Sequence, residues 1–542
     1  MKKTKLDVHG AGSLDRRDFL KASALAGAAA GLMGLTGCAP QSNPEKEPTP
    51  QTGEEAASPT QADETVECDF LVIGGGIGGF SAALTAHEEG IERVVLLEKY
   101  GTFGGTTLFA EGIFANNSRA QQELGYAPVA VKDILDMELE FHHRIINPQL
   151  FRSFLEASSD NVDWLMDQGI TFEKLDVPVL GTNCLHIYEG GNGTSAIEIL
   201  SKKAIEEYGI DARTDTQATE LILEDGAVIG ARAQSKGRTV DFMAPYVLVA
   251  TGGMAANPQM MDEYTKLDTD KYAYCGGNGA DGDGHRLCEA TAMGRAKNVC
   301  AMNMWLHVAG ASVKTTENYV GGMEASNIWI NENGVRFVGE DVTNDPGRLI
   351  DTNNVVHSQG RVYSIFDTAH IDSWAKNGTV TSFSGFCPVG KPIDGIPEAL
   401  DSAVANDMID YFRADSIEDL ARQIDVDPAA LRQTIDTWNG YVEAGKYEEF
   451  GKDPAVMFPI TEPPFYAARL INGVLTTVGG IRIDTKGRVC AADGTPVPGL
   501  HAAGVACSGF SSETYSMHAP GTAQGSGVYL GRMAARAAAG KE

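Results

Sequence analysis

The sequence is short of positive charge, and this shortage narrows what the protein can bind. Its 542 residues include 43 Lys and Arg against 73 Asp and Glu, which gives a formal net charge of -30. A surface this acidic repels nucleic acid and anionic lipid headgroups, so a nucleic-acid function is not expected. A chain of this length is too long for one compact core, and about two or three domains are expected.

Paired cysteine motifs are also missing. Nine cysteines are present, but none forms CxxC or CxxCH, so neither covalent haem nor a zinc site of paired thiols is expected. We expect mostly buried single thiols and no metal. An iron–sulfur cluster built on Cys275, Cys288 and Cys300 with a distant fourth ligand stays open as an alternative.

No apolar run reaches the roughly 20 residues that a membrane-spanning helix needs. The N-terminus instead has the pattern of a processing segment. The pair Arg16-Arg17 is typical of a twin-arginine export signal, and the apolar stretch 22–36 leads to Cys38 in a pattern typical of a lipoprotein cleavage site. We expect residues 1–37 to be a twin-arginine lipoprotein signal peptide, with Cys38 lipid-anchored on the outer face of the cytoplasmic membrane. A chance arginine pair before an alanine-rich helix is the alternative.

Residues 38–65 are rich in Pro, Gln, Ser, Thr and Glu. Such a segment cannot bury a core, so we expect a disordered tether between the lipid and the folded part of the chain. Order is expected to begin at Val66.

A βαβ unit is predicted directly after this tether. A short apolar strand, 69–73, precedes the glycine-rich turn 74–79. A helical pattern over 80–90 and a second strand, 93–97, follow and end at Glu98. Strand, turn, helix, strand and acid together are typical of a dinucleotide-binding unit.

Each glycine of the G-x-G-x-x-G turn has a physical role. Gly74 makes the tight turn, Gly76 lets the backbone approach a pyrophosphate, and Gly79 allows close packing of helix on strand. The helix N-terminus presents free N–H groups to the phosphates, and Glu98, 22 residues after Gly76, is placed to accept hydrogen bonds from ribose hydroxyls. An ordinary glycine-rich turn is the alternative, and the turn alone does not separate FAD from NAD.

Beyond this unit, the chain resembles the soluble fumarate reductase-like flavoproteins, a group that also includes urocanate reductases and, more distantly, 3-ketosteroid dehydrogenases. The resemblance runs from about Val66 to Arg536. The matching segments, in chain order, are Gly74–Gly79, Glu98, Gly104–Thr106, His186 with Gly190-Gly191, Ala250–Gly253, Gly282–Gly284, Ile330–Val338, Gly479–Asp484, Ala502–Gly504, Gly521–Ala523 and Gly531-Arg532.

The resemblance implies an α/β fold. A discontinuous Rossmann-like FAD-binding domain would take residues 66–301 and 477–542, with an inserted α+β capping domain at 302–476. FAD would be non-covalent, since no His lies in the 104–108 stretch where some relatives attach it. The implied FAD-binding residues are Gly74, Gly76, Ile77, Gly78, Gly79, Glu98, Lys99, Gly104, Gly105, Thr106, Thr107, Gly112, Ala250, Thr251, Gly252, Gly253, Asp283, Gly504, Thr522 and Ala523.

The substrate site departs from the family pattern. In relatives that reduce fumarate, flavin N5 gives a hydride to one carbon of a C=C bond and a protein acid protonates the neighbouring carbon. Here Asn344 stands at the position of the catalytic arginine, Thr476 and His518 replace the clamping His and Arg, and Val320 and Met323 replace the relay Glu and Arg. Asparagine cannot deliver the proton and the carboxylate fork is gone, so fumarate reduction is not expected.

Six residues are candidates for the rebuilt catalytic site. Tyr515 and His518 lie in the segment that runs onto the flavin in relatives, and either could donate a proton. Packing or hydrogen bonding to the backbone is the alternative for each candidate, and Met302–Met304 with Trp305 are expected to be core or pocket wall. The six candidates are His518, Tyr515, His307, Asn344, Arg348 and Tyr319.

The leading interpretation is an extracytoplasmic respiratory reductase of an activated C=C bond in a small-molecule enoate, aryl acrylate, enone or unsaturated lactone. An FAD-dependent dehydrogenase of the 3-ketosteroid type is the second, although Met517 stands where those relatives have a catalytic tyrosine. A non-catalytic flavin-binding lipoprotein is the third. Because one dinucleotide turn serves one FAD and no haem motif is present, a separate membrane electron donor, such as a quinol-oxidising cytochrome, is expected.

Overall fold

The computed structural model describes residues 61–265, 267–313, 315–344, 353–380, 389–447 and 449–541. The expected signal peptide, the lipid anchor at Cys38, most of the tether and the candidate Arg348 therefore lie outside the described residues. Among the helices that are described, none combines the length and the apolar character needed to cross a membrane.

A six-stranded sheet forms the centre of the predicted nucleotide-binding part, and five of its strands are parallel. Its order is β18 (Arg488–Cys490), β19 (Pro496–Ala502), β11 (Val247–Val249), β2 (Phe70–Ile73), β3 (Val94–Leu97) and β7 (Asp211–Arg213), with β18 antiparallel to its neighbour. Every residue of β2 and β3 is buried. Strands covered on both faces read as continuous apolar runs, which is why the sequence predicted them correctly.

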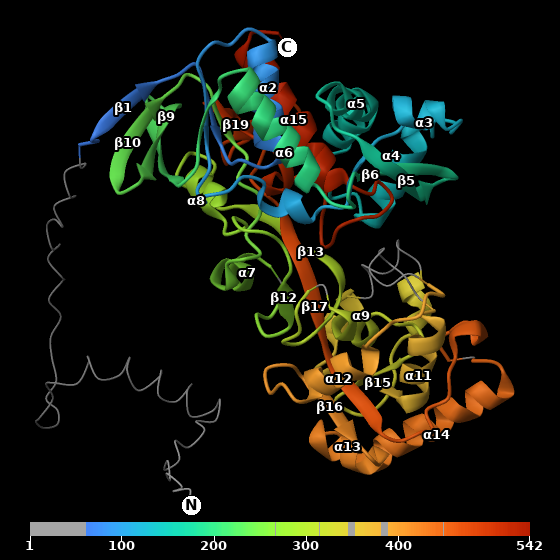
Figure 1. The fold of residues 1–542 in the computed structure, drawn as a ribbon. Coiled ribbons are helices and arrows are strands. Elements are labelled where there is room, and N and C mark those ends of the chain that lie inside the picture. Colours follow the sequence, from blue (N-terminus) through green and yellow to red (C-terminus); the bar gives the residue numbers. More distant parts are fainter. Residues whose placement is uncertain are drawn as a thin grey trace, which may run out of the picture. The chain divides into compact units, whose positions relative to one another are not determined.

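Two helices from opposite ends of the chain pack together beside this sheet (Figure 1), namely α2 (Ile77–Glu88) and α15 (Thr522–Ala538). A Cβ added at Gly531 would lie 2.4 Å from the Gly78 carbonyl oxygen, so only glycine permits this approach. Helix α2 begins at Ile77 and not at Phe80, where the apolar pattern placed its start. Gly78 and Gly79 of the glycine-rich segment therefore lie in the first turn of helix α2.

Two smaller sheets lie nearby. One has the order β1 (Glu64–Glu67), β10 (Arg238–Met243), β9 (Ala227–Ser235), β8 (Thr216–Glu224), and the other β4 (Gly112–Phe114), β6 (Thr182–Tyr188), β5 (Phe172–Val179). Strand β1 begins before Val66, where order was expected, because Glu64 and Thr65 pair with Val240 and Asp241 of β10. A tether reaching to residue 65 is thus too long.

A second six-stranded sheet is built around one long strand. Its strands are β12 (Tyr272–Tyr274), β13 (Lys297–Val308), β14 (Ile328–Asn331), β15 (Val362–Asp367), β16 (Tyr411–Ala414) and β17 (Phe465–Gly480). Residues 465–470 of β17 pair with β15, while residues 472–480 pair with β12 and β13 (Figure 1). One continuous strand therefore serves both parts of the fold.

The remaining helices surround these sheets. They are α3 (Arg119–Glu123), α4 (Val131–Phe141), α5 (Pro148–Asp167), α6 (Thr194–Lys202), α7 (Pro258–Tyr264), α8 (Asp283–Glu289), α9 (Thr316–Gly322), α11 (Thr368–Asn377), α12 (Ile396–Val404), α13 (Ile417–Gln423) and α14 (Pro428–Ala444), with 3-10 turns η1 (Gly105–Phe109), η3 (Glu340–Asn344), η4 (Pro454–Val456) and η5 (Gly504–Ala506) and the π turn η2 (Lys203–Glu207). The mixture of parallel sheet, mixed sheet and helices confirms the predicted α/β class.

The predicted domain boundaries fall opposite each other in the β13–β17 ladder. Ala301 pairs with Thr477, and Met302 pairs with Thr476. One hydrophobic core surrounds the parallel sheet, and two others are built from residues 306–470. This arrangement suits a cap whose entry and exit strands are neighbours, and the exact division stays a prediction.

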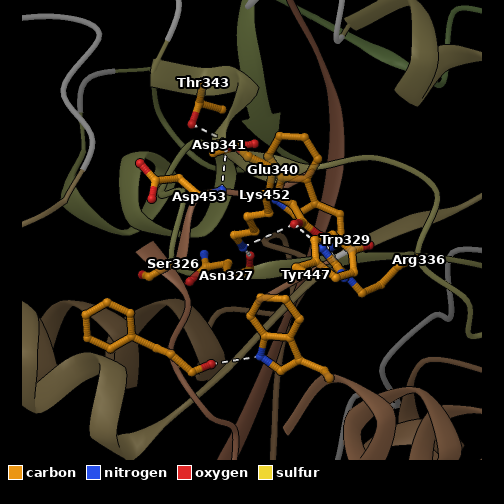
Figure 2. Close-up of polar contacts among 12 residues, drawn as sticks. Ser326, Asn327, Trp329, Arg336, Glu340, Asp341, Thr343, Tyr447, Lys452 and Asp453 are labelled. Carbon is orange, nitrogen blue, oxygen red and sulfur yellow. Dashed lines mark hydrogen bonds and ion pairs between the residues drawn. The ribbon is translucent and has the colours of Figure 1, made fainter. Parts of the chain in front are cut away.

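A buried ion cluster holds the segment that leads into η3 (Figure 2). The Glu340 carboxylate accepts from Arg336 Nε at 3.0 Å and Nη2 at 2.5 Å, and Lys452 Nζ lies 3.1 Å from it. The guanidinium lies over the rings of Trp438 and Tyr447, 4.5 and 4.3 Å from their centroids. Burial opposes the ionisation of Glu340, but Lys452 and Arg336 outweigh burial and hold its pKa below the ordinary value of 4.5.

Glu340→Gln is expected to destabilise the protein by about 3–5 kcal/mol, because it leaves two buried cations without an anion. Lys452→Met is the matched control and should cost less, since Arg336 keeps its partner. Because the folded-state pKa of Glu340 is depressed, its contribution is present above pH 4.5 and is lost as the pH falls through that folded-state pKa. Urea unfolding of both variants tests this, and equal losses would contradict it.

Candidate active site

A cavity of about 910 Å³ lies where the glycine-rich turn, β13, α9, β17 and the segment before α15 converge. Its volume is within the range of small-molecule and cofactor sites. Most of the predicted FAD-binding residues line it, namely Gly74, Gly76, Ile77, Gly78, Glu98, Lys99, Gly104, Gly105, Thr106, Thr107, Gly112, Ala250, Thr251, Gly252, Asp283, Gly504 and Ala523.

Three predicted cofactor residues do not line the cavity and support its walls instead. A Cβ at Gly79 would lie 1.9 Å from the Gly74 carbonyl oxygen, and one at Gly253 would lie 2.5 Å from Thr476 Oγ1. Thr522 Oγ1 donates to the Ala519 carbonyl at 2.6 Å. These contacts explain the residue types without any ligand.

Two glycines of the turn differ in what surrounds them: Gly74 is required by the backbone, whereas Gly76 faces open space in the cavity. Gly74 has φ +115°, and a Cβ there would lie 2.4 Å from the Ala250 carbonyl oxygen. At Gly76 the nearest atom to an added Cβ is 3.7 Å away, so the protein itself leaves room for a side chain there. This space at Gly76 is open to a ligand that approaches the backbone.

Glu98 lies at the same end of the cavity and is fixed by backbone donors. Its carboxylate oxygens accept from Gly75 N and Tyr100 N, each at 2.9 Å. Burial raises the pKa of Glu98, while these N–H groups act to lower it. A carboxylate with two hydrogen bonds keeps further lone pairs, which can accept from ribose hydroxyls.

Lys99 and Asp283, both predicted from the sequence, pair directly with each other, and Asp281, which the prediction missed, is a second partner of Lys99. Lys99 Nζ donates to Asp281 Oδ2 at 2.5 Å and to Asp283 Oδ2 at 2.8 Å, and Gln217 Nε2 donates to Asp283 at 2.7 Å. Burial opposes the Lys99 charge, but the two aspartates outweigh burial and raise its pKa. The position of Asp281 beside the Gly282–Gly284 motif was the available signal.

Three buried polar atoms at the cavity have no hydrogen-bond partner among the described residues. They are Thr251 Oγ1, Gln524 Oε1 and, at the wall formed by β13, Trp305 Nε1. A buried polar atom left unpaired costs about 1–3 kcal/mol, so a polar ligand would be stabilised there. Together with the open approach at Gly76 and the carboxylate of Glu98, the first two of these atoms fit FAD.

The wall formed by β13, α9 and β17 is largely apolar. It includes Met302, Met304 and Trp305 of β13, and Leu475 of β17. In the described part of the lining, the cations are Lys99 and Lys174, and both are paired with aspartates at 2.5 and 2.8 Å. A dicarboxylate would find no unpaired cation in that part.

Tyr515 lines the cavity at the N-terminus of α15. Its hydroxyl oxygen accepts from Gly521 N at 3.1 Å and from Ala523 N at 3.3 Å. Burial raises the pKa of the Tyr515 phenol to about 12, although the backbone N–H groups lower it. The phenol therefore holds its proton at neutral pH, and the two N–H groups would stabilise the phenolate that remains after proton transfer.

The two candidate histidines do not line the cavity. His307 is buried, its Nε2 lies 3.0 Å from the Ala311 carbonyl oxygen, and burial lowers its pKa. The ring of His518 packs edge-on against Phe141, with centroids 5.2 Å apart. Structural roles account for both contacts.

Of the other candidates, one lines the cavity and two cannot be placed at it. Tyr319 lines the cavity from α9. Asn344 is the last residue of η3, where only its backbone is described, and Arg348 lies outside the described residues. Tyr515 and Tyr319 are therefore the candidates that the structure brings to the cavity.

A buried network behind Tyr515 was missed by sequence reasoning. Ser516 Oγ donates to Glu138 Oε1 at 3.0 Å, and His142 Nε2 lies 3.3 Å from Glu138 Oε2. Ser512 N donates to His142 Nδ1 at 3.2 Å. Because Glu138 lies in α4 and His142 follows the end of this helix, about 370 residues earlier in the chain, no local pattern could reveal this link.

His186 and the three cysteines considered as cluster ligands are buried inside the protein. His186 Nε2 lies 2.7 Å from Ser118 Oγ, and burial lowers its pKa to about 4. Cys275, Cys288 and Cys300 are free and buried, and burial raises their pKa values. Over the described ranges no three His, Cys, Asp or Glu side chains gather as a metal site, so the iron–sulfur alternative gains no support.

Comparison with known proteins agrees with this geometry. Residues 69–517 match the model of an FAD binding domain family, and residues 13–33 match the twin-arginine translocation pathway signal sequence. The chain is 30% identical over 479 residues to the vinyl phenol reductase of Lactiplantibacillus plantarum, covering 87% of this chain and 96% of that one. It is 27% identical over 529 residues to the digoxin reductase of Eggerthella lenta, covering 91% of each.

Solved structures share the fold. The 3-ketosteroid Δ1-dehydrogenase of Sterolibacterium denitrificans aligns with a TM-score of 0.68 at 19% identity, covering 88% of this chain and all of that one. A flavocytochrome c3 fumarate reductase aligns with a TM-score of 0.61 at 24% identity, covering 89% and 79%. The chain belongs to the FAD binding domain family, as an FAD-dependent oxidoreductase that acts on CH–CH groups and carries a twin-arginine export signal.

Proposed function

We propose that the protein reduces an activated C=C bond in an enoate, aryl acrylate, enone or unsaturated lactone, and that fumarate is not its substrate. The observation that carries this proposal is the wall of the cavity, where apolar side chains and the Tyr515 hydroxyl stand without an unpaired cation among the described lining residues. The similarity to a vinyl phenol reductase and a digoxin reductase supports a substrate other than a dicarboxylate.

In this proposal the turn 74–79, Glu98 and Thr251 hold FAD, without a covalent bond. When bound and reduced by its electron donor, FAD would supply the hydride that adds to one carbon of the double bond. Tyr515 gives its proton to the neighbouring carbon, and the N–H groups of Gly521 and Ala523 stabilise the phenolate that forms. The apolar wall excludes water, which strengthens these interactions.

Tyr319 is proposed as the second polar group. It lines the cavity from α9, and a hydroxyl at this wall is suited to donate to the carbonyl or carboxylate that activates the double bond. Withdrawal of electron density towards that oxygen favours addition of the hydride at the far carbon. Tyr515 and Tyr319 would then divide proton donation and activation between them.

Export by the twin-arginine route places the enzyme outside the cytoplasm, where nicotinamide cofactors are not supplied. We propose that a lipid on Cys38 holds it at the outer face of the cytoplasmic membrane, connected by the tether that ends before β1. A separate donor, such as a quinol-oxidising cytochrome, would reduce the flavin there. The enzyme would thus serve as a respiratory reductase.

The proposal is tested by reducing the purified protein chemically without oxygen and following flavin absorbance after candidate alkenes are added. Rapid reoxidation by an alkene, and not by fumarate, is the expected result. Bleaching of the oxidised flavin by a saturated ketone would favour a dehydrogenase, and indifference to every compound would favour a non-catalytic flavin carrier. NADH added to the oxidised protein is expected to leave the flavin oxidised.

A further inference from the structure

Four methionines from separate parts of the chain line the cavity. Met302 and Met304 belong to β13, Met323 follows α9, and Met517 precedes α15. We call these four residues the methionine wall. Met302 and Met517 pack in one apolar cluster with Tyr515, so the wall is continuous with the proposed proton donor.

A bulge in β13 turns two neighbouring side chains of this strand towards the cavity. Met302 pairs with Thr476, Asn303 pairs with Val474 and Trp305 pairs with Gly473, so that the ladder leaves out first Leu475 of β17 and then Met304 of β13. Successive side chains of a regular strand point to opposite faces, yet both Met304 and Trp305 line the cavity. Bulges re-aim side chains in this way beside active sites.

Gly473 makes room for the indole that the bulge re-aims. A Cβ at Gly473 would lie 2.5 Å from Trp305 Nε1 and 2.7 Å from its Cδ1. Any other residue at this position would push the indole away. The irregular pairing of β13 with β17 and the glycine at position 473 together place the Trp305 indole at the cavity wall.

We propose that the methionine wall and Trp305 bind an uncharged aromatic ring of the substrate, so that the protein prefers aryl-conjugated alkenes. This inference rests on the proposed C=C reductase function and names its substrate class. Thioether sulfurs make favourable contacts with aromatic rings and their flexible side chains adapt to different ring substituents. Glu111 and Glu173 also line the cavity, and their charges disfavour an anionic substrate.

The first test measures binding without turnover. The oxidised holoenzyme is titrated calorimetrically with benzylacetone and with 2-pentanone, two saturated ketones that differ in a phenyl group. Benzylacetone is expected to bind at least about tenfold more tightly, from ring contacts of about 0.3–1.5 kcal/mol each. Dissociation constants within a factor of about two of each other would overturn the inference.

The second test removes sulfur while keeping volume, because Leu and Met exchange at small cost. Met304→Leu and Met517→Leu are each expected to weaken benzylacetone binding about two- to tenfold and to leave 2-pentanone binding unchanged. Met261→Leu is the matched control, since Met261 is fully buried and does not line the cavity. Equal effects of all three variants on both ketones would overturn the assignment of the wall.

A third test measures turnover and distinguishes the preference for an aromatic ring from the proposed reductase function. The reduced enzyme is offered four alkenes, namely benzalacetone, ethylideneacetone, cinnamate and crotonate, which combine phenyl or methyl with ketone or carboxylate. Benzalacetone is expected to reoxidise the flavin fastest. Equal rates with phenyl and methyl partners would overturn the ring preference and leave the reductase in place. Selective binding of benzylacetone without reoxidation by any alkene would keep the ring site and overturn the reductase.

Discussion

Tyr515→Phe is expected to slow the reoxidation of the reduced enzyme by an alkene about 100- to 10,000-fold, the usual contribution of a positioned general acid. The variant keeps the ring and the apolar contacts but lacks the proton. Stopped-flow absorbance of the flavin measures the effect. With the wild type, the rate should stay level through neutral pH and fall as the pH rises towards about 12, because the acid must be protonated to act.

A control is needed because the Tyr515 hydroxyl also accepts from backbone N–H groups at the start of α15. Losing that acceptor should cost about 1–3 kcal/mol of stability, which urea unfolding reports separately from the rate. Tyr188→Phe is the matched variant. Its hydroxyl is fully buried and has no hydrogen-bond partner in the described structure, so both stability and rate should hold. Near-normal reoxidation in a folded Tyr515→Phe protein would assign proton donation to another group.

Gly76→Ala is expected to weaken FAD binding about 5- to 150-fold while leaving the apoprotein as stable as the wild type. The added methyl meets no protein atom closer than 3.7 Å, but it occupies the space through which the cofactor approaches, and overpacking of this kind costs about 1–3 kcal/mol. Fluorescence titration of the apoprotein with FAD gives the affinity, and urea unfolding of the apoprotein gives the stability.

Two other glycine variants serve as controls for this prediction. Gly79→Ala would bring a methyl to 1.9 Å from a backbone oxygen, so it should unfold the protein whether or not FAD is added. Gly440→Ala, inside α14 with no atom within 4 Å of the added carbon, should stabilise the helix by about 0.5–1 kcal/mol and leave FAD affinity unchanged. A Gly76→Ala protein that retains full affinity would show that the cofactor does not approach this turn.

The nucleotide end of the site could be predicted from sequence because its determinants are local. Gly74, Gly76 and Glu98 lie within one βαβ unit, and their spacing follows from the geometry of a strand, a turn and a helix. The same holds for β2 and β3, whose buried apolar runs leave little choice of structure. Only the ends of these elements moved, by a few residues.

The substrate end could be predicted only in part. Tyr515 was found because a motif surrounds it, whereas His307 and His518 were chosen by residue type and the structure places neither at the cavity. The bulge at Met304 depends on pairing with a strand some 170 residues later, and the Glu138 network depends on a partner even further away. Long-range pairing of this kind leaves no periodic signal in one sequence.

The packing of α2 against α15 has a consequence for how the protein is made. Residues 74–79 are synthesised first, and the residues that complete the same cavity, such as Gly504, Ala523 and Gln524, follow more than 400 residues later. A nascent chain therefore cannot enclose a flavin until both segments have left the ribosome. Loading of the flavin must then be completed before the protein passes through a translocase that accepts folded cargo.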